Sequence, residues 1–283
     1  MTGLDLRPLS LGEILDRTFS LYRRNFLLFM GIAGIPAIAQ LSLALSPFVL
    51  RINPFVLNAK TTQQNLAAFF VLGGLGILVA LVAYLFSQGA TIFAVTDLYL
   101  GRTTGIGQSL RRVWGSLLSL FGVVFLNGLV ILLCTLALVI PGIYMMCRLL
   151  VCVPAALVED RGPRESLSRS FELTRDSAGR AFVIFVLYFI LAFAIGALLN
   201  WPFTFLAILT AKENPQTAQM WSAVAQVAST IGGVLINPIL LIATSVFYFD
   251  LRVRKEAFDL QFMLDPASER VTRSESGNLS ILP

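Results

Sequence analysis

The sequence predicts an all-α, polytopic integral membrane protein with six transmembrane helices and three cytoplasmic amphipathic interfacial helices. Of its 283 residues, 57% are hydrophobic and only 13% are charged, whereas about a quarter of the residues of a soluble domain are charged. The mean hydropathy is +0.80, and the apolar residues fall in long uncharged runs. The basic residues gather in alternate connections between those runs.

Five apolar runs are long enough to form membrane spans. A helix needs roughly 20 predominantly apolar residues to cross a hydrocarbon core of about 30 Å, and each run meets that length. The runs are Phe26–Leu50, Ala67–Thr96, Leu117–Arg148, Ala181–Ala211 and Val224–Phe249.

Two of these runs need subdivision, because Pro and Gly interrupt helices. The third continues to Leu157 and is too long for one span, so "IPGI" predicts a break that gives Leu117–Ile140 and Gly142–Val158. In the fourth, "NWP" predicts a span that ends near Leu199, followed by an interfacial piece, Phe203–Leu209. The total is six spans. We interpret the first as an uncleaved anchor, since no small-residue cleavage site closely follows it.

The distribution of charge predicts the orientation. With six spans, 17 of the 21 Lys and Arg residues fall before span one, after span six, or between spans two and three and spans four and five. Three lie on the other side, and Arg148 falls inside a span. Because Lys and Arg accumulate on the cytoplasmic side, both termini are predicted to be cytoplasmic.

This orientation also predicts partners and domain boundaries. The basic residues would face the anionic lipids of the inner leaflet, and a nucleic-acid partner is not expected. The expected domains are an amphipathic N-terminal helix over residues 1–25, a six-span membrane domain over 26–265, and a disordered cytoplasmic tail over 266–283.

A short motif occurs three times, each time before an odd-numbered span. The copies read "GEILDRTF", "GQSLRRVW" and "RESLSRSF" and share the pattern [E/Q]-x-L-x-R-x-[F/W]. On a helix, residues four apart are neighbours, so each copy predicts one polar pair and one apolar pair on different faces. The polar pairs are Glu13–Arg17, Gln108–Arg112 and Glu165–Arg169, and the apolar pairs are Leu15–Phe19, Leu110–Trp114 and Leu167–Phe171.

The repeat predicts three units, each an in-plane helix followed by a two-span hairpin. Ser10 with Glu13 predicts a capping box at the start of the first helix, and Pro163 suits the first turn of the third. The even spans also end alike, each in an acid with an arginine two to five residues later: Asp97 then Arg102, Glu159 then Arg161, and Asp250 then Arg252. The alternative is that any juxtamembrane segment is basic and amphipathic by necessity.

The composition argues against several kinds of chemistry. The chain has no histidine, which excludes Ser–His–Asp and Cys–His sites and His-ligated metals. It contains no GxxxxGK[ST] phosphate loop, and its three cysteines all fall within predicted spans, where we interpret them as small hydrophobic residues. No cofactor, metal or catalytic residue is expected.

Polar residues inside spans are the candidate site, because burying them in hydrocarbon is costly. Arg148 is foremost, and it has either a structural or a functional role. The amides either line a polar path or bond helices together, and they are Asn127, Gln40, Gln88, Gln226 and Asn237. Pro36, Pro154 and Pro238 are expected to kink their helices.

Three segments resemble a known bacterial family. They are "LRPLSLGEILDRTFSLYRRNF", "PGIYMMCRLLVCVPAALVEDRGPRESLSRSFELTR" and "FYFDLRVRKEAFDL". The chain is similar, except in its tail, to multi-helix membrane proteins named after the membrane domain of glycerophosphoryl diester phosphodiesterases. The resemblance implies a bacterial plasma-membrane protein but no phosphodiesterase activity, because that enzyme's separate barrel uses histidines.

These observations favour a non-enzymatic membrane module that acts through lipids or an unidentified protein partner. The alternative, from a different class, is a transporter or lipid-translocating protein that uses the region of Arg148. An intramembrane enzyme is the third hypothesis, but neither paired acids nor a serine with a base is found at one depth.

Overall fold

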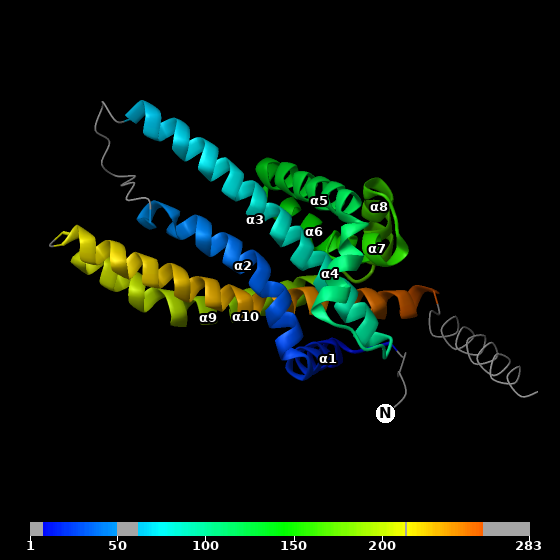
Figure 1. Cartoon of the computed structure of the whole chain (residues 1–283). Coiled ribbons are helices and arrows are strands. Elements are labelled where there is room, and N and C mark those ends of the chain that lie inside the picture. Colours follow the sequence, from blue (N-terminus) through cyan, green and yellow to red (C-terminus); the bar gives the residue numbers. More distant parts are fainter. Residues whose placement is uncertain (1–7, 50–61, 213, 257–283) are drawn as a thin grey trace, which may run out of the picture.

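The computed structural model describes residues 8–49, 62–212 and 214–256. Within these ranges every regular element is an α-helix (Figure 1), as the sequence predicted. The helices are α1 (Leu11–Arg24), α2 (Phe26–Val49), α3 (Thr62–Tyr99), α4 (Ile106–Trp114), α5 (Leu117–Ala137), α6 (Val139–Arg148), α7 (Cys152–Glu159), α8 (Pro163–Leu173), α9 (Ala178–Thr210) and α10 (Pro215–Glu256).

The six predicted spans are each matched by helical segments long and apolar enough to cross a membrane. Five lie within α2, α3, α5, α9 and α10, while α6 and α7 together make the fourth. Their bounds are Phe26–Leu45, Gly73–Tyr99, Leu117–Ala137, Val139–Glu159, Ala178–Thr210 and Gln216–Glu256. The predicted tail at 266–283, and most of the connection between the first two spans, lie outside the described residues.

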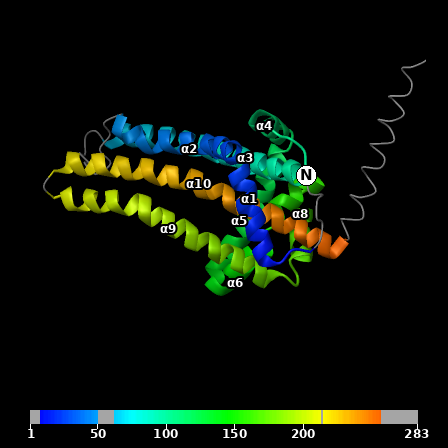
Figure 2. The ribbon, with the colours of Figure 1, turned by 90° about the horizontal axis from the view of Figure 1, so that it is seen from below.

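The short helices gather at one end of the bundle. Figure 1 shows α1, α4, α7 and α8 at this end, where α3 and α10 also finish, while α2, α9 and the start of α3 extend away from it. Figure 2 shows α9 and α10 running side by side and α2 lying along α10. We call this end the short-helix end.

Even-numbered spans form the interior of the bundle and odd-numbered spans its periphery. In the most apolar windows of spans two, four and six, 44%, 50% and 50% of the residues are buried, against 17%, 11% and 6% for spans one, three and five. The helices α3, α7 and α10 contact one another, and each odd span also contacts an even span of another hairpin: α2 touches α10, α5 touches α3, and α9 touches α6.

The core lies where the even spans meet, close to the short-helix end. Phe247, Tyr248 and Phe249 of α10 are all at most 1% exposed, and the ring of Phe249 stacks on Tyr99 of α3 with 4.6 Å between centroids. Gly89 lets α4 and α5 approach α3, because a Cβ there would lie 2.9 Å from the side chain of Val113.

The helix breaks differ from the prediction in two places. The third span ends at Ala137, because the next residue, Leu138, has an extended backbone. Pro141 falls in the first turn of α6, where a missing N–H removes no helical hydrogen bond. A second break, at residues 149–151, separates α6 from α7. Pro154 therefore lies in the first turn of α7 and does not kink a continuous helix.

The prediction that a span ends near Leu199 is wrong. The helix α9 is continuous from Ala178 to Thr210, with Pro202 inside it. The polar side chain before the proline helps to hold this segment in place: Asn200 donates to the carbonyl of Ala225 in α10 at 3.3 Å and accepts from the Thr204 hydroxyl at 2.7 Å. Packing against α10 along its length thus outweighs the local effect of one proline.

Candidate functional site

Helices occur at all three copies of the sequence motif. The capping box at the start of α1 is present, with the Glu13 N–H donating to Ser10 Oγ at 3.3 Å and the Ser10 N–H donating to the Glu13 carboxylate at 2.7 Å. Pro163 is in the first turn of α8, as predicted. The start of each helix therefore follows from local sequence.

The three short helices bury equivalent positions of the motif against the bundle. In each copy, the residue before the leucine and the residue before the aromatic are buried, and they are four apart. These residues are Ile14 and Thr18 in α1, Ser109 and Val113 in α4, and Ser166 and Ser170 in α8. In α8 the serines replace apolar contact with hydrogen bonds, since their hydroxyls donate to the carbonyls of Gly162 and Arg148.

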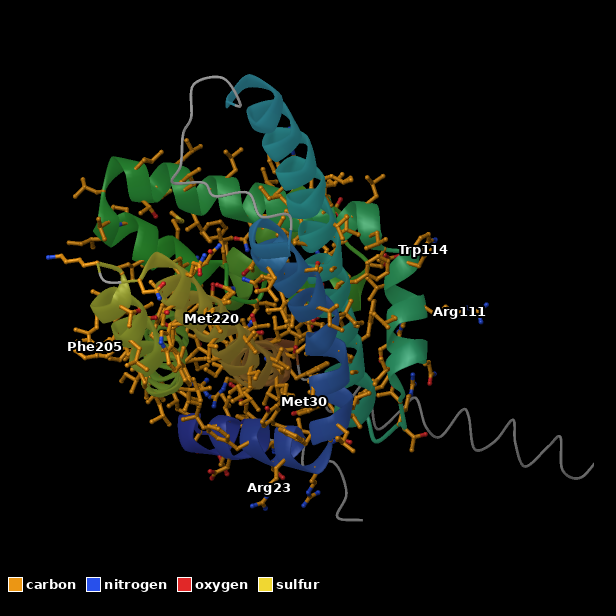
Figure 3. The ribbon with its side chains drawn as sticks, turned by 60° about the vertical axis from the view of Figure 1, so that its left-hand side comes forward. Arg23, Met30, Arg111, Trp114, Phe205 and Met220 are labelled. Carbon is orange, nitrogen blue, oxygen red and sulfur yellow. The ribbon has the colours of Figure 1, made fainter. Side chains whose placement is uncertain are left out.

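The motif's leucines and aromatics lie beside this buried face. Leu15, Leu110 and Leu167 are half-buried. Phe19 is 47% exposed and Trp114 is 72% exposed. Figure 3 shows Arg23 and Arg111 pointing away from the bundle on the same two helices. Helices α1 and α4 therefore present large apolar side chains and arginines outward together.

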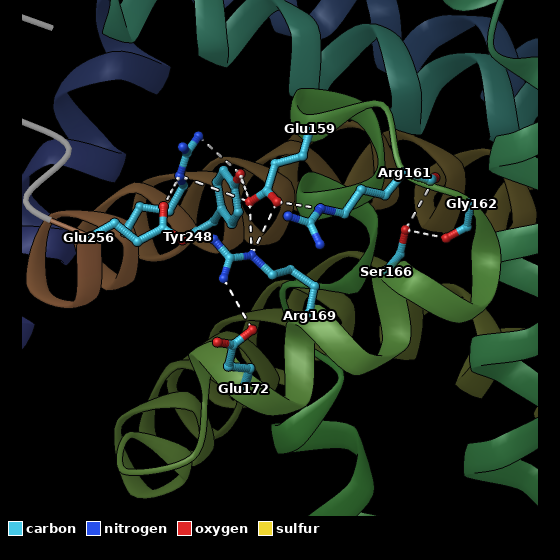
Figure 4. Close-up of polar contacts among 9 residues, drawn as sticks. Glu159, Arg161, Gly162, Ser166, Arg169, Glu172, Tyr248 and Glu256 are labelled. Atoms are coloured by element: carbon cyan, nitrogen blue, oxygen red, sulfur yellow. Dashed lines mark hydrogen bonds and ion pairs between the residues drawn. The ribbon is translucent and has the colours of Figure 1, made fainter. Parts of the chain in front are cut away.

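The arginine at the fifth position of the motif makes the next set of contacts. In α8 it is Arg169, which is 8% exposed and donates from Nε to both oxygens of Glu159 at 3.1 and 3.2 Å. The same carboxylate accepts from the Tyr248 hydroxyl at 2.7 Å and pairs with Arg161 at 2.6 Å. Figure 4 shows this cluster joining α7, α8 and α10.

Further ion pairs extend the Glu159 cluster. Arg169 also pairs with Glu172 at 3.2 Å and with Glu256, and Arg252 donates to Glu256 at 3.0 Å. Burial alone would lower the pKa of Arg169, but the charge and hydrogen bonds of Glu159, and then those of Glu172, raise it above its ordinary value. Arg169 therefore stays charged.

A second cluster joins α3 and α4. Asp97, which is 7% exposed, accepts from Arg112 at 3.2 Å, and the Arg112 guanidinium lies 4.6 Å from the ring centroid of Phe93. Arg17, the equivalent arginine of α1, reaches the same end of α3, where it donates to the Tyr99 hydroxyl at 3.3 Å. The motif arginine of each short helix thus contacts the end of an even span.

A third cluster ties the start of α1 to α9 and α10. The Asp250 carboxylate is fully buried and accepts the Leu9 N–H at 2.7 Å, Arg180 at 2.8 Å and Arg254 at 3.0 Å. Both arginines also donate to the Leu9 carbonyl, at 2.8 and 2.6 Å. The acids that end the second and fourth spans therefore bind the short helix that follows each span, and the acid of the sixth span binds the segment before α1.

Arg148 lies near the short-helix end and makes structural contacts. Its Nη2 donates to the Phe171 carbonyl at 2.8 Å, and its guanidinium is 5.3 Å from the Phe171 ring centroid. Its own carbonyl accepts the hydroxyls of Ser170 and Thr174. These contacts connect α6 to α8. Asn127, on α5, has a buried Oδ1 without a hydrogen-bond partner in the part of the chain described.

The other predicted amides gather elsewhere, around a cavity of about 630 Å³ between α2, α3 and α10. Gln226 and Asn237 line it, and Gln88 is linked to it by donating to the hydroxyl of Tyr84, a lining residue, at 2.7 Å. The polar lining residues are Gln40, Tyr84, Gln226, Ser229, Thr230 and Asn237. The structure therefore brings together four of the six predicted polar residues, Gln40, Gln88, Gln226 and Asn237, and leaves Arg148 and Asn127 apart from them.

Sequence reasoning missed the tyrosines of both sites. Tyr248 lies in the Glu159 cluster, and Tyr84 and Tyr188 border the amides, with the Tyr188 hydroxyl donating to Asn237 at 3.2 Å. No pattern distinguishes these residues from the aromatic content of a membrane helix. Within the described residues, no group of three or more His, Cys, Asp or Glu is placed to hold a metal ion.

Fold and composition define the described part of the chain as all-helical, with six candidate membrane spans. Residues 118–251 match the model of a domain of unknown function, DUF7847. That stretch covers most of the last four candidate spans and contains Glu159, Arg169 and Tyr248 of the Glu159 cluster. No curated protein and no solved structure matched the chain.

Proposed function

We propose that this chain is a non-enzymatic lipid-interacting module of the bacterial plasma membrane, with both termini cytoplasmic. In this proposal α1, α4 and α8 lie in the inner interface, and the bundle consists of three helix-plus-hairpin units around a pseudo-threefold axis. The observation that carries it is the shared burial of two motif positions, which turns Phe19 and Trp114 outward beside exposed arginines.

Interfacial helices have this arrangement of side chains. Apolar residues enter the acyl boundary, aromatic rings lie at headgroup level, and arginines contact anionic lipids. The concentration of 17 of the 21 basic residues on one predicted side supports the same placement. Membership of the family named after the glycerophosphoryl diester phosphodiesterase membrane domain is also part of this proposal.

The three acid-centred clusters support the threefold arrangement. Asp97, Glu159 and Asp250 end the three even spans, and each binds the short-helix segment that follows it or, for Asp250, the one before α1. These contacts would fix each interfacial helix at one depth relative to the spans. We infer that the clusters hold the lipid-facing helices in register and take no part in catalysis.

Depth-dependent fluorescence quenching tests the proposal. In a variant with Trp201→Phe and Trp221→Phe, Trp114 is the single tryptophan, and the protein is reconstituted into phosphatidylcholine–phosphatidylglycerol vesicles. Phospholipids brominated near the headgroup should quench Trp114 more than those brominated near the chain end. The matched control, Trp114→Phe with Phe125→Trp halfway along α5, should show the opposite order.

A Trp114 that is quenched by aqueous iodide and by neither brominated lipid would overturn the interfacial placement. The two reporters start from similar exposure, since Phe125 is 61% exposed and Trp114 is 72% exposed. Different quenching therefore reports depth in the bilayer and not burial in the protein.

Lipid or solute translocation is the second candidate, and the cavity between α2, α3 and α10 is the observation in its favour. Phe29, Ile32 and Leu85 lie within four residues of lining positions on α2 and α3, belong to the packed core, and are all at most 4% exposed. Fluorescent phospholipid flux across vesicles that contain the protein tests this candidate. Flux that exceeds that of protein-free vesicles and falls in Asn237→Leu would favour translocation over a static module.

A further inference from the structure

The cavity between α2, α3 and α10 has the size and composition of a ligand site. Its volume of about 630 Å³ falls within the roughly 300–1,000 Å³ usual for small-molecule pockets, which combine an apolar lining with a few placed polar groups. Its walls come from the first, second and sixth spans, so two different hairpins build it.

The lining carries no Asp, Glu, Lys or Arg among the described residues. A charged group bound there would lose part of its hydration without gaining a counter-charge, which is unfavourable in an apolar medium. The walls do offer hydroxyl and amide groups, which recognise hydroxyls and carbonyls. The cavity therefore selects for an uncharged molecule that can form hydrogen bonds.

Several polar groups at the cavity have hydrogen-bonding capacity left to use. Asn237 accepts from Tyr188 through its Oδ1, which leaves both protons of its amide for another partner. Pro238 has no N–H, so the carbonyl of Val234, a lining residue, lacks its helical donor. The Tyr84 hydroxyl accepts from Gln88, so its proton can be donated. In the hydrocarbon layer, water or a polar ligand must satisfy such groups.

The residues that line the cavity argue for a bound molecule with an apolar part. The polar residues are interleaved with apolar ones, including Leu43, Ile77 and Leu81. Phe29, Ile32 and Leu85 belong to the buried core cluster, and each is one to four residues along its helix from a residue that lines the cavity. The packed core thus bounds the cavity on the side of the short-helix end.

We propose that this cavity binds an uncharged lipid whose hydroxyl or carbonyl groups hydrogen-bond to Tyr84, Gln226 and Asn237 while its chains lie along α2 and α3. This inference rests on the proposed lipid-interacting function and gives the ligand class of its site. It adds a recognition site within the spans to the interfacial contacts of α1, α4 and α8.

Photolabelling tests the inference with a defined probe. The full-length protein in phosphatidylcholine vesicles is exposed to a diacylglycerol that carries a diazirine in one chain, and labelled peptides are mapped by mass spectrometry. Labelling should concentrate on cavity-lining segments of α2, α3 and α10. Phosphatidic acid with the same chains should label those segments about tenfold less, because its headgroup is charged.

Two pairs of variants separate binding from folding. Ala80→Phe fills the cavity from α3 and should reduce diacylglycerol labelling about tenfold, while Val79→Phe, on the adjacent position outside the lining and 52% exposed, should leave it unchanged. The double variant Gln226→Leu/Asn237→Leu keeps the volume of the cavity and removes its two amides. It should lower both the labelling by diacylglycerol and the preference for diacylglycerol over phosphatidic acid. All variants must elute and unfold like the parent protein.

Equal labelling of parent and Ala80→Phe, or equal labelling of the cavity by both probes, would overturn the inference. The Trp114 quenching experiment is independent of the cavity. Interfacial quenching without cavity labelling therefore refutes this inference alone, whereas a water-exposed Trp114 refutes the proposed function.

Discussion

Asp250→Asn should destabilise the protein strongly, because Asp250 is the centre of the contacts between α1, α9 and α10. The substitution keeps the size of the side chain and an oxygen that can accept the Leu9 N–H, which lies 2.7 Å from Asp250 in the parent protein. It removes the negative charge and places an amide N–H donor beside Arg180 and Arg254. In the parent protein these arginines donate to the Asp250 carboxylate at 2.8 and 3.0 Å.

The structure sets the expected magnitude. Removing one partner from a buried ion pair costs about 3–5 kcal/mol, because the remaining charge is left uncompensated. The side chain of Asp250 is 0% exposed, but those of Arg180 and Arg254 are 25% and 38% exposed and can be partly hydrated. We therefore expect the lower end of the range, about 3 kcal/mol, which corresponds to a fall in Tm of about 6–10 °C.

Thermal unfolding in detergent micelles with a thiol-reactive fluorophore measures this effect. Cys147 and Cys152 are both buried, so they react when the bundle opens. The matched control is Asp176→Asn, because that carboxylate is 80% exposed and its pair with Lys255 spans 3.6 Å. Its Tm should change by about 1 °C or less. Equal Tm values for the two variants would refute the assignment of Asp250 as a central tie.

The same assay checks two further predictions. Gly89→Ala should lower the free energy of unfolding by about 1–3 kcal/mol, because the new Cβ would lie within 2.9 Å of Val113 and 3.1 Å of Leu120. The control, Gly73→Ala, has no atom within 4 Å of its new Cβ and should be neutral or slightly stabilising. An equal change in Tm for both variants would show that the close packing of α4 and α5 does not depend on Gly89. Arg169→Lys should cost about 2 kcal/mol, because one ammonium cannot replace a guanidinium fork shared among three carboxylates, and an unchanged Tm would contradict that role.

Much of the fold could be predicted because its signals are local. Hydrophobic length located all six candidate spans, and the Ser10–Glu13 capping box and Pro163 located the starts of α1 and α8. The helix breaks were harder to place. Pro202 interrupts hydrogen bonding within α9 only locally, and packing against α10 preserves the helix.

The candidate site could be predicted only in part, because its contacts join residues far apart in the chain. The acids at the ends of the even spans and the arginine of the repeat were each visible in the sequence. Their pairing across elements, such as Asp250 with Leu9, was not. Ser166 and Ser170 occupy positions where the buried face of an amphipathic helix would carry apolar residues, but hydrogen bonds to carbonyls allow them to be buried.

The intramembrane polar residues show the same limit. The free-energy cost of burying a polar side chain in hydrocarbon identified Arg148 and the amides together, since this cost depends only on residue type and depth in the membrane. It could not separate Arg148, which bonds to the Phe171 carbonyl, from Gln226 and Asn237, which line the cavity. That distinction depends on which face of each helix meets a neighbour.

The side of the membrane on which each connection lies is the sharpest test of the proposed six-span orientation. Single cysteines at Thr103, Gly162 and Lys212, in a variant whose three native cysteines are replaced by alanine, can be labelled in intact cells with a membrane-impermeant maleimide. We expect Lys212→Cys to react in intact cells, and Thr103→Cys and Gly162→Cys to react only after permeabilisation. Labelling of Gly162→Cys from outside would contradict the six-span orientation and the placement of α1, α4 and α8 at the inner surface.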